Sequence, residues 1–113
     1  MKKLIFGTLA LVALQSTAHA HNVMCNFTEP FITLSFDNNK GLLTRYDYGG
    51  TERTVAASSS LQGHIMTVTS ADSTVKLVID LSKKGNDGMS DREYDFDAVL
   101  NGKLYGGCDE IKD

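Results

Sequence analysis

Apolar and polar residues alternate at period two along much of the chain, and this pattern predicts a succession of short β-strands. The alternation is clearest at residues 74–81, where every odd-numbered position is valine, leucine or isoleucine. Residues 51–57 follow the pattern more weakly, and Ser58–Gly63 reads as a loop. The remaining predicted strands cover residues 23–27, 31–36, 42–48, 64–70, 92–100 and 103–108.

Two of these segments carry a definite expectation about which side chains share a face. The pattern at 42–48 groups Leu42, Thr44, Tyr46 and Tyr48. The pattern at 92–100 groups Tyr94, Phe96, Ala98 and Leu100 and leaves Glu93, Asp95 and Asp97 on the polar side. We expect both segments to be half-buried strands, because strict alternation is typical of a sheet with one solvated face.

Turn-forming residues separate the strands and favour antiparallel connections. Asp37–Gly41, Gly49-Gly50 and Asn101-Gly102 are strong turn signals, and Ser82–Asp91 is a longer polar loop. Beyond the N-terminal segment, no stretch of ten or more residues has helical periodicity. The predicted fold is therefore all-β: a small antiparallel β-barrel or β-sandwich of about six to eight strands.

The first 20 residues predict export. Lys2 and Lys3 precede an apolar run, and the segment ends Ala18-His19-Ala20, which is typical of a secretory signal peptide with cleavage before His21. The run of about 11 residues is shorter than the roughly 20 that a spanning helix needs. We expect residues 1–20 to be removed and residues 21–113 to form a single periplasmic or secreted β-domain, in a bacterial style of export, without a membrane anchor.

The charge of the exported domain limits its partners. The formal net charge of −3 becomes −5 when residues 1–20 are removed, because they carry two lysines and no acid. An acidic domain without basic clusters argues against binding to nucleic acid or to an anionic membrane. It suits a cationic protein or a divalent cation instead, and it also keeps a small exported protein in solution.

Two cysteines, Cys25 and Cys108, lie near the two ends of the exported domain. In an oxidising compartment we expect them to form a disulfide. Such a bond requires the first and last strands to be neighbours, and would pin the sheet closed. Metal binding by two isolated cysteines is the alternative.

The long polar loop is one candidate metal site. Asn86, Asp87, Ser90 and Asp91 offer oxygen ligands, and Ca²⁺ takes roughly six to eight of them. The spacing departs from that of a helix–loop–helix calcium motif. The same residues also suit Asx and Ser turns, in which their side chains accept hydrogen bonds from amides within the loop.

A second candidate metal site is the new N-terminus. The amine and imidazole of His21 can chelate copper, with His64 as a second nitrogen ligand and methionines as soft ligands for Cu(I). A mature chain that begins with histidine resembles copper-carrier β-sandwiches. The alternatives are a frayed terminus at His21 and an ordinary strand residue at His64. No other cofactor is expected.

Catalytic motifs are missing from the sequence. It contains no Ser-His-Asp order that stands out and no glycine-rich phosphate loop, and His64 has no evident nucleophile beside it. We therefore expect a protein that is not an enzyme.

Two resemblances extend this reading. Cys25–Leu34, which contains Thr-Glu-Pro-Phe, resembles a segment of small uncharacterised periplasmic bacterial proteins, and Asp87–Asp91, Tyr94 and Gly107-Cys108 are similar to the rest of such proteins. Size, export, acidity and one disulfide also resemble the periplasmic lysozyme inhibitors, small β-barrels that push a polar loop into the lysozyme cleft. Their Ser-Gly-x-Tyr motif is absent; the loosely comparable segments are Ser58–Gly63 and Tyr105-Gly106-Gly107.

The sequence thus favours an exported, non-enzymatic domain that binds a protein partner, with a cationic lysozyme as the most concrete example. The resemblance implies that Ser59, Ser60 or Tyr105 would enter the partner's cleft. Copper or calcium binding and a purely structural role in the envelope are the alternatives.

Overall fold

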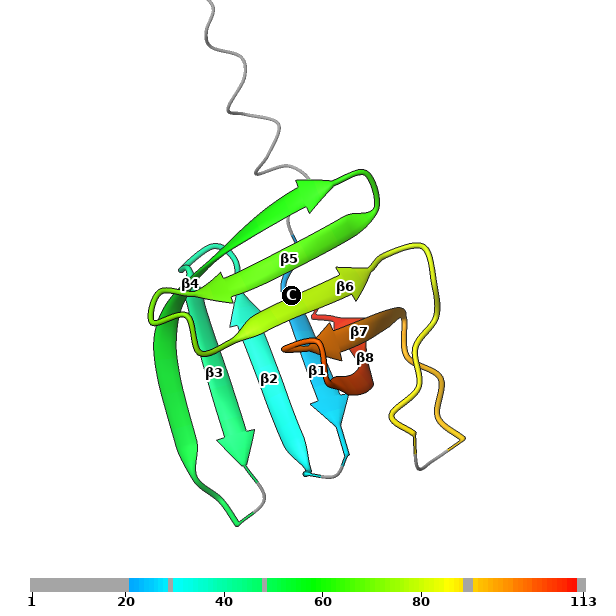
Figure 1. Ribbon diagram of the computed structural model, residues 1–113, viewed down its shortest axis with the longest axis horizontal. Coiled ribbons are helices and arrows are strands. Elements are labelled where there is room, and N and C mark those ends of the chain that lie inside the picture. Colours follow the sequence, from blue (N-terminus) through cyan, green and yellow to red (C-terminus); the bar gives the residue numbers. More distant parts are fainter. Residues whose placement is uncertain (1–20, 29, 48, 89–90, 112–113) are drawn as a thin grey trace, which may run out of the picture.

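Antiparallel strands, each hydrogen-bonded to the next along the chain, close into a barrel in the computed structural model (Figure 1). The structure describes residues 21–28, 30–47, 49–88 and 91–111, so the expected signal peptide lies outside them. None of these residues belongs to a helix that is long and apolar enough to cross a membrane. The eight strands are β1 (Val23–Phe27), β2 (Ile32–Asp37), β3 (Leu42–Asp47), β4 (Glu52–Gln62), β5 (Ile65–Ser70), β6 (Lys76–Asp80), β7 (Phe96–Leu100) and β8 (Leu104–Glu110).

The first and last strands close the barrel. β1 pairs with β2 on one side and with β8 on the other, and Cys25 is the direct partner of Cys108 across that seam. The two cysteines, 83 residues apart, form a disulfide. The all-β fold and the disulfide are confirmed, and the barrel is the correct choice between the two predicted architectures.

Alternate residues of the strands fill the interior. The alternating apolar side chains of β1, β2, β5 and β6 are buried and form one cluster. An eight-stranded barrel is just wide enough for side chains to fill it or for one small ligand to enter. The best-buried members of the cluster are Val23, Cys25, Phe27, Leu34, Phe36, Leu43, Met66, Val68, Leu77, Ile79 and Cys108.

The face of β3 that points towards the core is opposite to the one that carries most of its apolar residues. Leu42 and Tyr46 point outward and are exposed, whereas Leu43 is buried. The reason is register: Leu43 pairs with Phe36, which points inward, and directly paired residues in an antiparallel sheet lie on the same side. Tyr48, grouped with Leu42 by the sequence pattern, lies outside the described residues.

The predicted loop at Ser58–Gly63 is wrong, because β4 runs without a break from Glu52 to Gln62. The serine run has weak strand propensity, but Ser58, Ser59 and Ser60 pair with Thr69, Val68 and Thr67 of β5. Neighbouring strands thus override local propensity.

The two halves of β4 pair with different strands. Residues 52–56 pair with β3, and residues 57–62 pair with β5. The β3–β4 hairpin consequently extends beyond the end of β5, as the lower left of Figure 1 shows.

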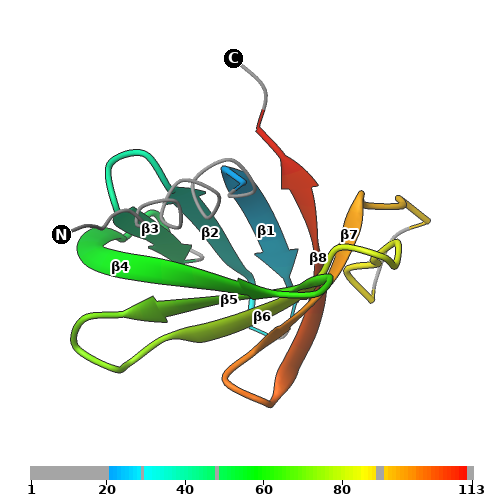
Figure 2. The ribbon, with the colours of Figure 1, turned by 90° about the horizontal axis from the view of Figure 1, so that it is seen from above.

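The described residues between β6 and β7 lie outside the ring of strands, next to β7 and β8 (Figure 2). We call residues 83–88 and 91–95 the strap. Within it, Tyr94 is buried against Gly107, whose neighbour Cys108 points into the barrel. Because successive residues of a strand face opposite sides, Tyr94 packs on the outer surface. The Oγ1 of Thr28 donates to the backbone oxygen of Asp87 at 2.7 Å and ties the strap to the end of β1.

Two expectations about the last third of the chain need correction. The strand predicted from Arg92 begins only at Phe96, since Tyr94 forms an isolated bridge with Gly85 and packs outside the barrel. The last predicted strand, 103–108, also extends further, because β8 continues to Glu110 and the amide of Ile111 donates to the backbone oxygen of Asn22.

Candidate functional site: an arginine pair in an open pocket

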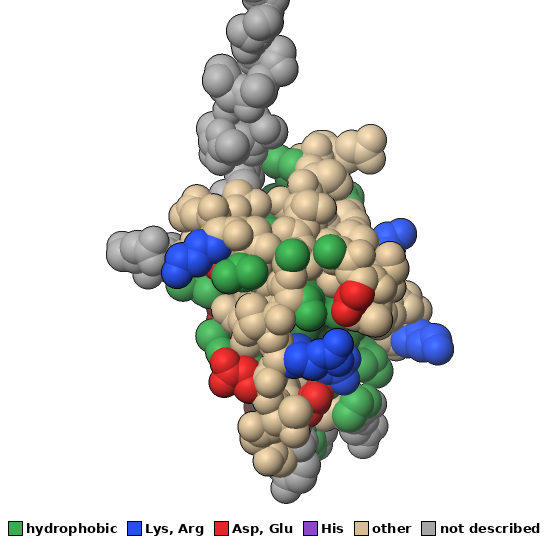
Figure 3. All heavy atoms as spheres, turned by 90° about the vertical axis from the view of Figure 1, so that its left-hand side faces the viewer, with side chains coloured by type: hydrophobic (Ala, Val, Ile, Leu, Met, Phe, Trp, Pro, Cys, Tyr) green, Lys and Arg blue, Asp and Glu red, His purple; other side chains and the backbone are tan. Residues whose placement is uncertain are grey.

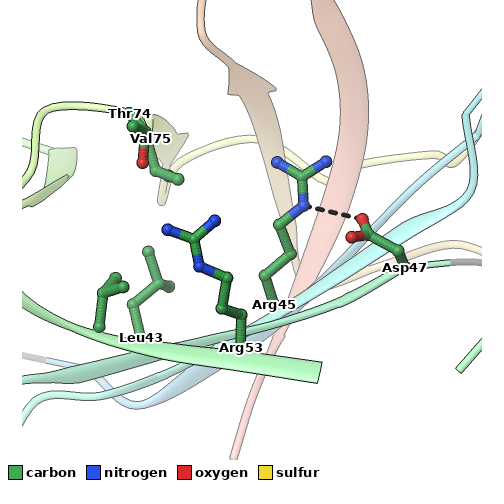
Figure 4. A pocket seen from close by; sticks show the side chains of 7 residues that line it. Leu43, Arg45, Asp47, Arg53, Thr74 and Val75 are labelled. Carbon is green, nitrogen blue, oxygen red and sulfur yellow. Dashed lines mark hydrogen bonds and ion pairs between the residues drawn. The ribbon is translucent and has the colours of Figure 1, made fainter. Parts of the chain in front are cut away.

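A pocket opens where the β3–β4 hairpin leaves β5. Its volume is about 240 Å³, and it lies between the inner face of that hairpin and the β5–β6 turn. From the side of the molecule that carries β3 and β4, basic and acidic side chains lie close to exposed hydrophobic ones (Figure 3). The pocket is lined by Leu43, Arg45, Asp47, Arg53, Val55, Thr74 and Val75 (Figure 4).

Strand periodicity brings two arginines to the same wall of this pocket. Leu43 is buried in the core, so Arg45, two residues further along β3, faces the same side. Arg45 and Arg53 are direct partners in the β3–β4 ladder. Gly49 and Gly50 in the connecting turn have φ values of 106° and 93°, which only glycine adopts readily, and they fix this register.

The two guanidinium groups are the main feature of the pocket. Both arginines rise from the hairpin on the same side, and the end of Arg53 is directed towards Thr74 and Val75 (Figure 4). Like charges directly opposite each other destabilise an antiparallel pair. Neighbouring carboxylates offset this repulsion, one for each arginine.

Asp47 binds the Arg45 guanidinium at its Nε atom. The Nε–H of Arg45 donates to Oδ1 of Asp47 at 2.8 Å, and both side chains are half-buried. Because the contact uses Nε, it orients the planar group and directs the two terminal nitrogens away from Asp47. Arg45 is thereby preoriented towards a second acceptor.

Arg53 is held more loosely. Its Nη2 lies 3.7 Å from Oδ2 of Asp72, beyond hydrogen-bonding distance, and its side chain is 70% exposed. An exposed ion pair of this kind contributes little to stability. Arg53 can therefore turn towards a ligand without losing a strong contact.

Asp72 is a fixed anion at the rim of the pocket. Its Oδ1 accepts hydrogen bonds from the Ser70 hydroxyl, the Thr74 hydroxyl and the Thr74 amide at 2.7, 2.7 and 3.1 Å. These bonds, that of Ser70 first, lower the pKa of Asp72 from 3.8 to about 2. The charge of Arg53 makes a smaller contribution to this lowering of the pKa. Asp72 stays ionised at neutral pH and shapes the turn that forms the upper wall.

The chemistry of the pocket is that of an anion site, with a mostly polar lining and a smaller apolar part. A guanidinium presents five N–H donors in a planar fork that matches a carboxylate or a phosphate. Val55, which is partly exposed, supplies hydrocarbon surface beside the two forks, and the buried Leu43 and Val75 lie behind it. The arrangement binds and orients an anion.

The residues predicted to contact a protein partner are not gathered in one loop. Ser59 and Ser60 belong to β4, and the Ser59 hydroxyl donates to Oδ1 of Asn38 at 2.9 Å. Tyr105 belongs to β8, where it points outward and is 69% exposed. Of the three, Tyr105 offers the largest accessible surface.

The two histidines have different acidic partners. His21 Nδ1 lies 3.2 Å from Glu110 Oε2, and the His21 ring packs edge-on against Phe96. His64 Nε2 lies 3.9 Å from Asp80 Oδ1. Across the described ranges, no three His, Cys, Asp or Glu residues come together in a way that could hold a metal ion.

The acidic residues of the strap take part in structural contacts. Asp87 Oδ2 accepts a hydrogen bond from the Tyr94 hydroxyl at 3.1 Å, whereas Asp91 is exposed. Ser90, whose hydroxyl was also proposed as a calcium ligand, lies outside the described residues. Beside them, Arg92 stacks over the Tyr94 ring at 4.2 Å and pairs with Asp109.

Sequence reasoning missed the arginine pair, although a signal was present. Arg45 and Arg53 lie at equal distances on either side of Gly49, so a hairpin centred there pairs them directly. The pattern drew attention instead to the apolar residues of the opposite face of β3.

No family model matches the chain, and searches of curated proteins and of solved structures also return no match. The function is therefore inferred from the residues of the site itself.

Proposed function

We propose that this is an exported, non-enzymatic binding protein that holds a small anion in the Arg45–Arg53 pocket. One observation carries the proposal: two arginines face each other directly across a hairpin and line an open cavity. Asp72 balances Arg53 only loosely, at 3.7 Å, so part of the repulsion between the two arginines remains, and an anion between the two groups removes it.

The architecture supports a ligand of small size. Eight-stranded barrels accommodate one small ligand at most. Pockets for drug-sized molecules measure roughly 300–1,000 Å³, and this one is about 240 Å³. The ligand is accordingly a small metabolite or the charged end of a larger molecule.

The test is equilibrium binding by calorimetry, with acetate, hexanoate, sulfate and phosphate as probes of the exported domain at low ionic strength. We expect at least one anion to bind at 1:1 stoichiometry, and Arg45→Gln and Arg53→Gln each to weaken it tenfold or more, because a charged hydrogen bond is lost. Lys84→Gln, which removes an exposed charge from the strap, serves as the matched control and leaves binding unchanged.

Two results would count against the proposal. One is the absence of binding for every anion tested. The other is equal affinity in the wild type and in both arginine variants, with unchanged melting temperatures that show intact folding.

Tyr105 favours a second candidate function, binding to a cationic protein. Its ring is 69% exposed on the outer face of β8, and tyrosine is enriched at the centres of protein interfaces. A net charge of −5 after export would speed association with a basic partner such as a lysozyme. In this version Tyr105→Ala abolishes inhibition of lysozyme at low salt, and normal lysozyme rates at micromolar wild-type protein would exclude it.

A further inference from the structure

We infer that the ligand of the Arg45–Arg53 pocket is a monocarboxylate with a short apolar body, rather than phosphate or sulfate. This inference rests on the proposed function and narrows it to one chemical class. Charge, shape and the walls of the pocket each support it.

The charge of the pocket favours an anion that carries a single negative charge. Arg45 and Arg53 supply two positive charges, and Asp47 and Asp72 supply two negative ones at its edges. The four groups therefore sum to zero formal charge. A dianion would add a second negative charge close to two carboxylates, and like charges at such distances repel.

The shape of the donors favours a planar anion. With Nε bound to Asp47, Arg45 offers the two terminal nitrogens at the far end of its fork. Two parallel N–H donors match the two oxygens of a carboxylate. Arg53, which is exposed and lacks a close hydrogen bond to Asp72, can approach the same oxygens from the paired strand.

The remaining walls favour a hydrocarbon group on that carboxylate. Leu43 and Val75 are buried beside the arginines, and Val55 is partly buried against the same core. An apolar body placed there removes both its own surface and the exposed part of Val55 from water. Inorganic anions make no use of these walls.

The experiment measures dissociation constants by calorimetry at pH 7.5 and fixed low ionic strength, for acetate, butyrate, hexanoate, decanoate, sulfate and phosphate. We expect affinity to rise from acetate to hexanoate by roughly fourfold per methylene group. It should then level off, because the pocket of about 240 Å³ is filled. Sulfate and phosphate should bind at least tenfold more weakly than hexanoate.

A valine variant tests the apolar wall separately. Val55→Thr keeps the volume and adds a hydroxyl, so it should weaken hexanoate several-fold and leave acetate unchanged. Val78→Thr is the matched control, since Val78 lies between the inward-facing Leu77 and Ile79 and points outward on β6. Circular dichroism and melting temperature show whether each variant folds.

The possible outcomes distinguish the inferred ligand class from the proposed anion-binding function. If sulfate or phosphate binds as tightly as hexanoate and is lost in Arg45→Gln, the pocket is an anion site and the ligand class is wrong. If affinity does not depend on chain length, the apolar wall plays no part and the inference also fails. If none of the six probes binds, the proposed function fails with it.

Discussion

Arg53 contributes differently to stability and to binding. It lies opposite another arginine, is mostly exposed and lacks a close hydrogen bond to its acidic neighbour. Its side chain therefore adds little to the ligand-free protein, whereas Leu43, fully buried two positions before Arg45, belongs to the core. The two residues lie in one pocket but should respond to substitution in opposite ways.

Urea unfolding of the ligand-free protein tests this contrast. Arg53→Gln should leave the free energy of unfolding unchanged or raise it by up to about 1 kcal/mol, because a like-charge pair is relieved. Leu43→Ala should lower it by about 2–5 kcal/mol, because a cavity is left in the core. A loss of more than about 1 kcal/mol in Arg53→Gln would assign Arg53 a structural role.

Asp72, at the rim of the pocket, makes the stability of the folded protein depend on pH. Its pKa is lowered in the folded protein to about 2, chiefly by the Ser70 and Thr74 hydrogen bonds, and that of Asp80 is lowered by Ser82. A lowered pKa contributes stability that is fully present above the unfolded-state value of 3.8 and is lost as the pH falls through the folded value.

The melting temperature measured from pH 7 to pH 2 checks this sign. The wild type should lose stability mainly below about pH 4, as these carboxylates take up protons. Asp72→Asn should start lower at pH 7 and show a shallower fall in the acid range. If the two curves run parallel down to pH 2, Asp72 is not a stabilising anion.

At the level of single elements, the period-two pattern was sufficient to predict the strands that have one face against the core. The alternating residues of β1, β2, β5 and β6 were predicted and are buried. β4 was cut short because its serine run carries no apolar pattern, and only its ladder with β5 makes it a strand. The buried face of β3 could not be predicted from the sequence, because apolar residues occur on both sides of the strand. The pairing of Leu43 with Phe36 determines which side is buried. The arginine pair depends on the register of β3, and it was therefore not predicted from the sequence.

The strap depends on the close approach of Tyr94 to β8. A Cβ atom at Gly107 would lie 2.6–2.7 Å from three atoms of Tyr94, which is closer than contacts allow. Gly107→Ala should therefore displace Tyr94 and lower the free energy of unfolding by about 1–3 kcal/mol. Tyr94→Phe, which loses the hydroxyl contacts to Asp87 and Arg92 but keeps the ring, should cost about 0.5–1.5 kcal/mol.

Hydrogen exchange distinguishes displacement of the strap from a general loss of stability. In Gly107→Ala, the amides of Gly85 and Tyr94, which bond to each other's carbonyl oxygens, should exchange faster than those of β5. Equal acceleration in both places would mean that the strap unfolds only with the whole barrel.

At the scale of the whole molecule, closure of the barrel depends on one seam. The Cys25–Cys108 disulfide crosses it and links residues 83 positions apart. Cross-linking over such a separation stabilises by about 4–5 kcal/mol on the chain-entropy model. Reduction, or replacement of both cysteines by serine, should lower the free energy of unfolding by about that amount in urea titrations. A loss below about 1 kcal/mol would show that strand pairing alone closes the barrel.

The pocket lies on the hairpin that extends past β5, so ligand binding should leave the seam unchanged. The paired strands of the barrel support the pocket, and the two arginines that line it would bind the anion. The proposed function therefore depends most on whether an anion contacts both guanidinium groups.

The most direct measurement is NMR of the arginine side chains during titration of the exported domain with hexanoate at pH 6. The Nε–Hε signals of Arg45 and Arg53 should shift together and saturate at one equivalent, while the signal of Arg92, which is engaged with Asp109 and Tyr94, stays in place. If Arg45 and Arg53 do not move, or move no more than Arg92 up to millimolar hexanoate, the pocket is not a binding site for this ligand class and the central claim is wrong.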